Sequence, residues 1–183
     1  GVRLVGSEMC IRDSSYPLIT IDPYTSIWSF ADRLDEDVTR HWTGKEQGLL
    51  GVIEVDGVLY RFMGKEAPEK ETPVRFEKAA VQQSVNVLPT QTYYTFKCGP
   101  VCLDLVFTSP LLLEDLDRMS TPVNYISWQV RAMDEKAHET RLAIEASPSL
   151  AVHSNDQAVT VAFEEENGIS YLKVGTVEQS VLA

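Results

Sequence analysis

Strand-like runs separated by glycine-containing turns constrain this chain more than any other feature. The clearest case is a pair of apolar-rich runs, Leu49–Val55 and Val58–Met63, joined by Asp56-Gly57. Both central residues of a type I′ turn need a positive φ, and Asp followed by Gly accepts that conformation. The segment therefore predicts a β-hairpin with a two-residue turn.

A second hairpin is predicted around Gly99-Pro100, between Gln91–Lys97 and Val101–Thr108. Its second arm alternates as a half-buried strand does, because successive side chains point to opposite faces. One face carries Val101, Leu103, Leu105 and Phe107, and the other carries Cys102, Asp104, Val106 and Thr108. Cys98 and Cys102 would face each other across a three-residue loop. We favour two free thiols, because the three cysteines, with Cys10, are an odd count.

The second half of the chain continues this pattern. Strands are predicted at Asn124–Ala132 and Thr140–Ala146, with a turn at Asp134–Ala137, and a last hairpin at Ala158–Phe163 and Ile169–Val174 around Asn167-Gly168. In the first of these strands, Ile126, Trp128, Val130 and Ala132 share one face. Before Pro89, the residues Val81, Val85 and Val87 also have a strand-like spacing.

Helix is scarce in this pattern. Leu111–Met119 is long enough for about two turns, with Ser109 as a candidate N-cap and Pro110 at the first helical position. Many short strands at regular spacing predict an all-β fold, an antiparallel β-sandwich of supersandwich-like type. We expect this sandwich to be incomplete at the C-terminus, because Leu182-Ala183 directly follows a strand without a turn signal.

The domain organisation is predicted as a leader, residues 1–14, followed by one β-sandwich domain, residues 15–183. The leader contains the string SEMCIRDS, which resembles a translated sequencing-adaptor read-through of metagenomic assemblies. We interpret it as non-native; the alternative is an ordinary N-terminal arm. The polar stretch Glu66–Pro73 is bounded by proline and is typical of an exposed loop. The remainder is apolar enough for a sizeable core, since 44% of the chain is hydrophobic.

Charge and hydropathy exclude two kinds of partner. The chain has 16 basic and 27 acidic residues, so its formal charge is -11, and binding to nucleic acid depends on clustered Lys and Arg. No apolar run approaches the roughly 20 residues that a membrane-spanning helix needs. We therefore expect neither a nucleic-acid nor a membrane partner. Gly1–Ser14 has no apolar core and no small-residue cleavage site, so no signal peptide is legible.

Arg40-His41-Trp42 followed by Thr43-Gly44 is the stretch richest in chemistry. Arg offers a planar fork for a carboxylate, His changes charge near neutral pH, and Trp presents a flat apolar surface. Such a triplet can line a substrate pocket at a domain interface. The alternative is a structural corner in which Trp42 packs in the core, Gly44 turns the chain and Arg40 pairs with a nearby acid such as Asp37 or Asp22.

Asp22 and Trp28 form a second candidate cluster, within DPYTSIW. Asp before Pro favours a turn, and the aromatic residues are expected to fill the core beneath it. Asp22 is also conceivable as one of two acids for glycoside chemistry, although no second acid is identified. No metal, phosphate-binding or nucleophile motif is present, so we expect no cofactor. His138 is expected to be solvated beside its turn, and His153 to lie in a loop.

Several of these stretches, in this order, resemble the N-terminal region of the glutaminase A family. They are PLITIDPYTSIW (17–28), RHWTG (40–44), VDGVLYRFMG (55–64), VLPTQTYYTF (87–96), PLLLEDL (110–116) and PVNYISWQV (122–130). The resemblance implies a β-sandwich domain followed by a helical α/α-toroid domain on the same chain, which is absent here. It also implies a small-molecule substrate and an extracellular or periplasmic location.

Three functions stay open from the sequence. The first is an accessory or substrate-pocket domain of a hydrolase that converts L-glutamine to L-glutamate and ammonia, inactive by itself. The second is a β-sandwich domain of a carbohydrate-active enzyme, because fold does not fix function. The third is a free-standing binding module. The candidate substrate-binding residues are Arg40, His41, Trp42, Asp22 and Trp28, and the resemblance supplies no catalytic residue.

Overall fold

The protein is an all-β sandwich, seen in a computed structural model that describes residues 15–65, 78–154 and 156–178. The leader at residues 1–14 and the loop at Glu66–Pro73 lie outside the described residues. The strands are β1 (Tyr16–Thr20), β2 (Ser26–Ser29), β3 (Arg40–His41), β4 (Leu49–Val55), β5 (Val58–Met63), β6 (Lys78–Ala79), β7 (Val81–Leu88), β8 (Gln91–Cys98), β9 (Val101–Thr108), β10 (Tyr125–Ala132), β11 (Thr140–Ala146), β12 (Val159–Glu166) and β13 (Ile169–Thr176).

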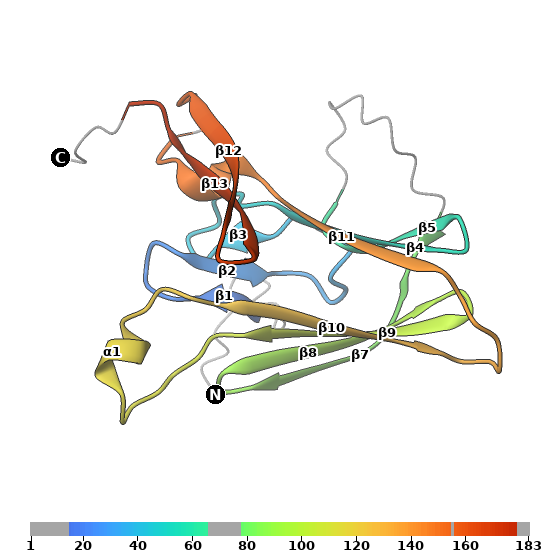
Figure 1. The fold of residues 1–183 in the computed structure, drawn as a ribbon. Helices are drawn as coiled ribbons and strands as arrows, with labels where there is room; N and C mark the ends of the chain where they lie inside the picture. Colours follow the sequence, from blue (N-terminus) through green and yellow to red (C-terminus); the bar gives the residue numbers. More distant parts are fainter. Residues whose placement is uncertain (1–14, 66–77, 155, 179–183) are drawn as a thin grey trace, which may run out of the picture.

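Two four-stranded sheets form the two layers of the sandwich (Figure 1). One has the order β10-β9-β8-β7 and the other β11-β4-β5-β6. Neighbouring strands run antiparallel except β5 and β6, which run parallel. A small sheet, β1-β2-β3, lies at one end of the layers, and β12 and β13 pair only with each other.

The predicted hairpins are confirmed at their turns. Asp56 and Gly57 have φ of 50° and 83°, and Asn167 and Gly168 have φ of 53° and 76°. These positive values match the type I′ requirement, so the turn residues set the register of both hairpins. Both arms of the second hairpin are also present, as β8 and β9.

The turn of the second hairpin separates the two cysteines. Cys98 is opposite Val101 across Gly99-Pro100, and Cys102 is opposite Lys97. The loop therefore has two residues, and the two thiols point to opposite faces of the sheet. Both are buried free thiols, and burial raises the pKa of Cys98 to about 12.

The core lies between the two layers, and the predicted alternation of β9 produces it. Val101, Leu103, Leu105 and Phe107 are all at most 1% exposed. They pack with Leu34 of the β2–β3 loop and with buried side chains of the other strands, namely Leu18, Ile27, Leu49, Ile53, Val55, Tyr60, Phe62, Met63, Tyr94 and Phe96. Aromatic rings dominate the centre, where Phe96 lies 5.8 Å from Phe62 and 5.9 Å from Tyr94 between ring centroids.

The predicted helix is shorter than expected and begins later. Helix α1 covers Leu116–Met119, and Asp115 rather than Ser109 caps it by accepting from the Arg118 amide. Ser109 is engaged elsewhere, since its hydroxyl accepts from the Thr20 amide at 3.1 Å and donates to Asn124 Oδ1 at 2.5 Å. A long-range contact with β1 therefore takes the side chain that a local cap would have used. No described helix has the length and apolarity needed to cross a bilayer.

Apolar side chains of the last strands are much less covered. Trp128 lies opposite Leu105 and on the same face of the sheet, yet it is 55% exposed. In the β12–β13 hairpin, Phe163 and Leu172 are 69% and 68% exposed. The layers thus cover the inner faces of β8 and β9 fully, that of β10 in part, and the last hairpin hardly at all.

Candidate functional site

The five candidate residues lie together in the small sheet and its loops. Asp22 lies in the β1–β2 loop, Trp28 in β2, and Arg40 and His41 form β3. In the register of β2 and β3, Trp28 is directly opposite Arg40, and Ile27 is opposite His41. The small sheet thus brings the two candidate clusters together. We call this group, residues 22–28 and 40–46, the corner.

A tight turn after β3 presents Trp42. The Gly44 amide donates to the His41 carbonyl at 2.8 Å, and the His41 amide donates to the Lys45 carbonyl at 2.8 Å. Gly44 has φ of 91°, which a residue with a Cβ adopts only with strain. The Trp42 amide donates to the Ser26 carbonyl at 3.2 Å and fastens the turn to β2. Gly44 thus turns the chain as predicted.

Both ring nitrogens of His41 have partners. The Thr43 amide donates to Nδ1 at 3.3 Å, and the Thr43 hydroxyl lies 2.7 Å from the same nitrogen. Nε2 lies 2.8 Å from the Pro23 carbonyl, which can only accept. The geometry thus fits the tautomer with its proton on Nε2. His41 is therefore held in one orientation between two loops.

The Pro23 carbonyl joins the two halves of the corner. It also accepts from Trp42 Nε1 at 2.9 Å. Asp22 fixes the loop that holds this carbonyl, because Asp22 Oδ1 accepts from the amides of Tyr24 and Thr25 at 2.7 and 2.8 Å. This is the local turn chemistry expected of Asp before Pro. Asp22 therefore acts on the backbone of its own loop.

Arg40 is engaged by acidic side chains on its own surface. Its Nη1 lies 3.2 Å from Glu46 Oε1, and its Nη2 lies 3.5 Å from Asp37 Oδ2. The same Nη1 donates to the Gly44 carbonyl at 3.5 Å. Asp37 was one of the two acids named for the structural alternative, and Glu46 was not foreseen. A substrate carboxylate at Arg40 would have to displace one of these carboxylates.

The two tryptophans of the corner differ in exposure. Trp28 is half-buried, and its Nε1 donates to Ser26 Oγ at 2.8 Å. Trp42 is 56% exposed, so the structural alternative is wrong in placing it in the core. Its ring lies beside that of His41, with centroids 5.6 Å apart. The hydrogen bond to Pro23 holds the indole over the loop, where one edge is anchored and the ring surface is accessible.

A second histidine cluster joins the two layers and was not predicted. His138 lies in the β10–β11 loop, with Nδ1 2.6 Å from Asp56 Oδ2 and Nε2 2.8 Å from Asp134 Oδ1. Its side chain is only 9% exposed, so the expectation that it is solvated is wrong. Hydrogen bonding to Asp134 and then to Asp56 raises the pKa of His138, and the same contacts lower the pKa of both carboxyls. The cluster ties the β4–β5 turn to the β10–β11 loop.

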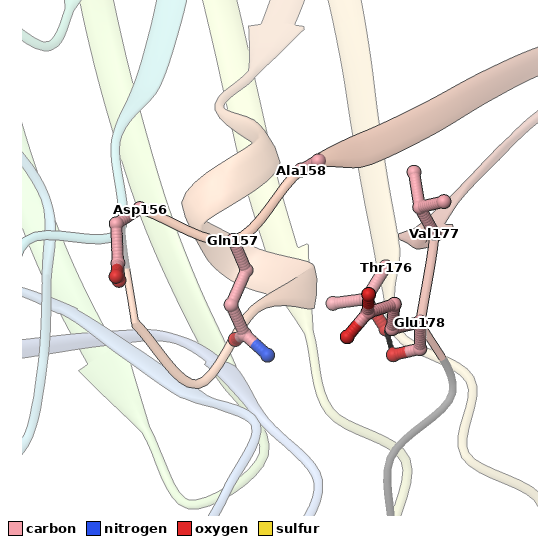
Figure 2. A pocket seen from close by; sticks show the side chains of 6 residues that line it. All are labelled: Asp156, Gln157, Ala158, Thr176, Val177 and Glu178. Carbon is pink, nitrogen blue, oxygen red and sulfur yellow. Dashed lines mark hydrogen bonds between the residues drawn. The ribbon is translucent and has the colours of Figure 1, made fainter.

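A surface depression of about 290 Å³ lies at the base of the β12–β13 hairpin. Asp156 and Glu178 are on opposite sides of it in Figure 2, with Gln157 between them. Gln157 Oε1 is occupied by the amides of His153 and Ser154 at 2.7 and 2.9 Å. The depression is thus lined by two carboxylates on opposite sides and by an amide whose oxygen already accepts two hydrogen bonds. Within the described ranges, no group of three His, Cys, Asp or Glu residues could hold a metal ion.

Sequence reasoning missed the residues that hold the corner in place. The Pro23 carbonyl cannot be recognised by residue type, because every residue has one. Lys45 Nζ donates to the carbonyls of Val152 and His153 at 3.1 and 2.7 Å, joining the corner to a loop over 100 residues away. The only local signal was Thr43, since a hydroxyl two residues from a histidine is within reach of its ring.

Comparison with known families covers most of the chain. Residues 90–183 match the model of a family described as a domain of unknown function, DUF5127, and residues 4–74 match another, DUF4964. The second match begins inside the stretch interpreted as a leader, so the leader stays a prediction. The corner falls within the DUF4964 match, and strands β8 to β13 fall within the DUF5127 match.

A curated protein named glutaminase A, from Aspergillus oryzae (strain ATCC 42149 / RIB 40), is 27% identical over 174 residues. The aligned region is 89% of this chain and 24% of the relative. The chain therefore spans about a quarter of the length of this relative. No solved structure matches the chain.

Proposed function

Because the chain belongs to the DUF5127 family of domains of unknown function, we propose that it is the N-terminal β-sandwich domain of a longer glutaminase A-like hydrolase. The observation that carries this proposal is the similarity to the Aspergillus oryzae glutaminase A along most of the chain. The reaction would be hydrolysis of L-glutamine to L-glutamate and ammonia. Since the chain spans only a quarter of that relative, most of the chemistry would belong to the rest of the polypeptide, a helical domain.

The corner is the part of this domain that would contribute to the substrate pocket. Trp42 offers an anchored, half-exposed aromatic surface, and His41 is fixed in one orientation beside it. Asp22 and Trp28 would support them from the β1–β2 loop and β2. Arg40 would act mainly by positioning the turn, because Glu46 and Asp37 already balance its charge. This arrangement favours recognition of a substrate over bond-making by the corner itself.

The test of the function uses the full-length protein that carries this domain. Ammonia release from L-glutamine is measured against a panel of glycosides, with the 183-residue chain assayed in parallel. We expect turnover of glutamine by the full-length protein and none by the chain alone. Hydrolysis of a glycoside without release of ammonia would contradict the proposal and favour the carbohydrate-active alternative.

The role of the corner is tested in the same protein with Trp42→Ala and a matched control, Trp128→Ala. The two tryptophans are 56% and 55% exposed, but Trp128 lies in β10, outside the corner. Loss of one aromatic contact to a substrate is worth about 1–2 kcal/mol, so we expect kcat/KM for glutamine to fall roughly 5- to 30-fold for Trp42→Ala. The control should keep the parental KM. Equal effects of both changes would argue against a pocket role.

A further inference from the structure

One face of the β12–β13 hairpin is apolar and uncovered. In the register of the two strands, Val161 is opposite Val174 and Phe163 is opposite Leu172. Successive side chains alternate between faces, so these four residues share one face. They are 58%, 37%, 69% and 68% exposed in the same order. We call this set the hairpin face.

The opposite side of the hairpin is built differently. It carries Glu164, Glu166 and Lys173, and the Tyr171 hydroxyl donates to Glu164 Oε2 at 2.7 Å. Charged side chains and a satisfied hydroxyl are typical of a solvated surface. The hairpin is therefore amphipathic, as in a strand pair whose apolar side packs against another layer. Its other side is mostly polar, although Ile169 near the turn is also exposed.

The hairpin face has no covering layer within the described residues. β12 and β13 pair with no other strand, and most of their side chains are exposed. A two-stranded hairpin is marginal in water, and independent stability needs a third strand or packing against another element. Contiguous exposed apolar residues of this kind mark an interaction surface. A covering element is therefore required on physical grounds.

We propose that the hairpin face docks onto the remainder of the same polypeptide in the full-length protein, against an apolar helix surface of the following domain. This inference rests on the proposed function. The curated relative is about four times as long as the stretch it shares with this chain, because that stretch is 24% of its length. A domain on the same chain also binds as a tethered partner, at a high effective concentration.

A second copy of the chain fits this face less well. The chain has a formal charge of -11, and near the turn Glu165 shares the hairpin face, with Glu164 and Glu166 next to it on the opposite side. Apposing two identical hairpins would bring these carboxylates together, and like charges across a contact are destabilising. A contact with the following domain does not bring two copies of these carboxylates together.

The test compares amide hydrogen exchange of β12 and β13 in the 183-residue chain and in the full-length protein. Docking converts a locally unstable hairpin into part of a packed unit, so we expect exchange at least roughly 100-fold slower in the full-length protein. Equal exchange in the two proteins would overturn the proposal. A dimeric 183-residue chain with a protected hairpin would also overturn it, in favour of a second copy.

Paired variants locate the contact. Phe163→Ser with Leu172→Ser should return fast exchange to the hairpin of the full-length protein, whereas Ile169→Ser, on the opposite side and 67% exposed, should not. All three changes should leave the melting temperature of the 183-residue chain unchanged, which shows that the variants fold. Identical behaviour of the double variant and the control would contradict the docking surface. Absence of glutamine turnover in the full-length protein would contradict the proposed function, but the exchange test of docking would still be valid.

Discussion

The strands β9 and β12 have similar patterns and very different surroundings. In β9, Val101, Leu103, Leu105 and Phe107 are at most 1% exposed, because a second sheet covers the face that they share. In β12, Val161 and Phe163 alternate in the same way but are 58% and 69% exposed. The difference teaches that alternation specifies which face of a strand is apolar, whereas burial needs a second layer. The sandwich supplies that layer to the inner strands only.

The sharpest way to break this comparison is to truncate one phenylalanine in each region. Phe96→Ala in the core of the 183-residue chain should lower the free energy of unfolding by about 3–5 kcal/mol, through lost burial and a cavity. Phe163→Ala in the hairpin should change it by less than about 0.5 kcal/mol. Urea unfolding followed by tryptophan fluorescence measures both. Comparable losses would show that the hairpin is packed in the isolated chain.

A second pair of variants, Gly64→Ala and Gly168→Ala, separates the cost of a steric clash from the cost of backbone strain. Gly64 and Gly168 have φ of 77° and 76°, so alanine is strained at both, by about 1–2 kcal/mol. A Cβ at Gly64 would lie 2.2 Å from the Leu49 carbonyl oxygen, whereas one at Gly168 meets nothing within 4 Å. Gly64→Ala should therefore cost about 2–4 kcal/mol and Gly168→Ala only the strain. Thermal unfolding of the two variants at one pH gives the difference, and equal costs would contradict it.

The His138 cluster ties the β4–β5 turn to the β10–β11 loop, outside both regions, and should give the smallest effect, because Asp56 and Asp134 are 48% and 41% exposed. The raised pKa of His138 adds stability that is fully present below its ordinary value of 6.5 and is lost as the pH rises through the raised value. The lowered pKa values of both carboxyls add stability above their ordinary 3.8 that is lost in stronger acid. The cluster should therefore stabilise most between about pH 4 and 6.5.

The His138→Gln variant tests this window. The melting temperatures of the parent and the variant should differ most near the middle of the window and converge in alkaline solution. The convergence is the control, since a lost packing contact would lower the melting temperature at every pH. A difference that does not depend on pH would therefore show that His138 acts through packing and not through its charge.

Much of the fold was predictable because it depends on short-range chemistry. Asp56-Gly57 and Asn167-Gly168 fix their hairpins through φ alone, and the alternation of β9 assigns its core face. The corner was partly predictable, since Gly44 turns the chain and Asp22 organises its loop as their residue types indicate. The exposure of Trp42 was not, because it depends on the Pro23 carbonyl, 19 positions earlier in the chain.

The sequence by itself determined the hairpins, their turns and the polarity of their faces, because these follow from φ preferences and from a period of two, whereas the short strands β1, β2, β3 and β6 were not predicted. Only the tertiary structure decided which long-range partners each side chain meets. Ser109 binds β1 instead of capping a helix, and His138 is held between Asp56 and Asp134 instead of facing water. Such choices depend on residues some 80 to 90 positions away, which local propensity does not encode.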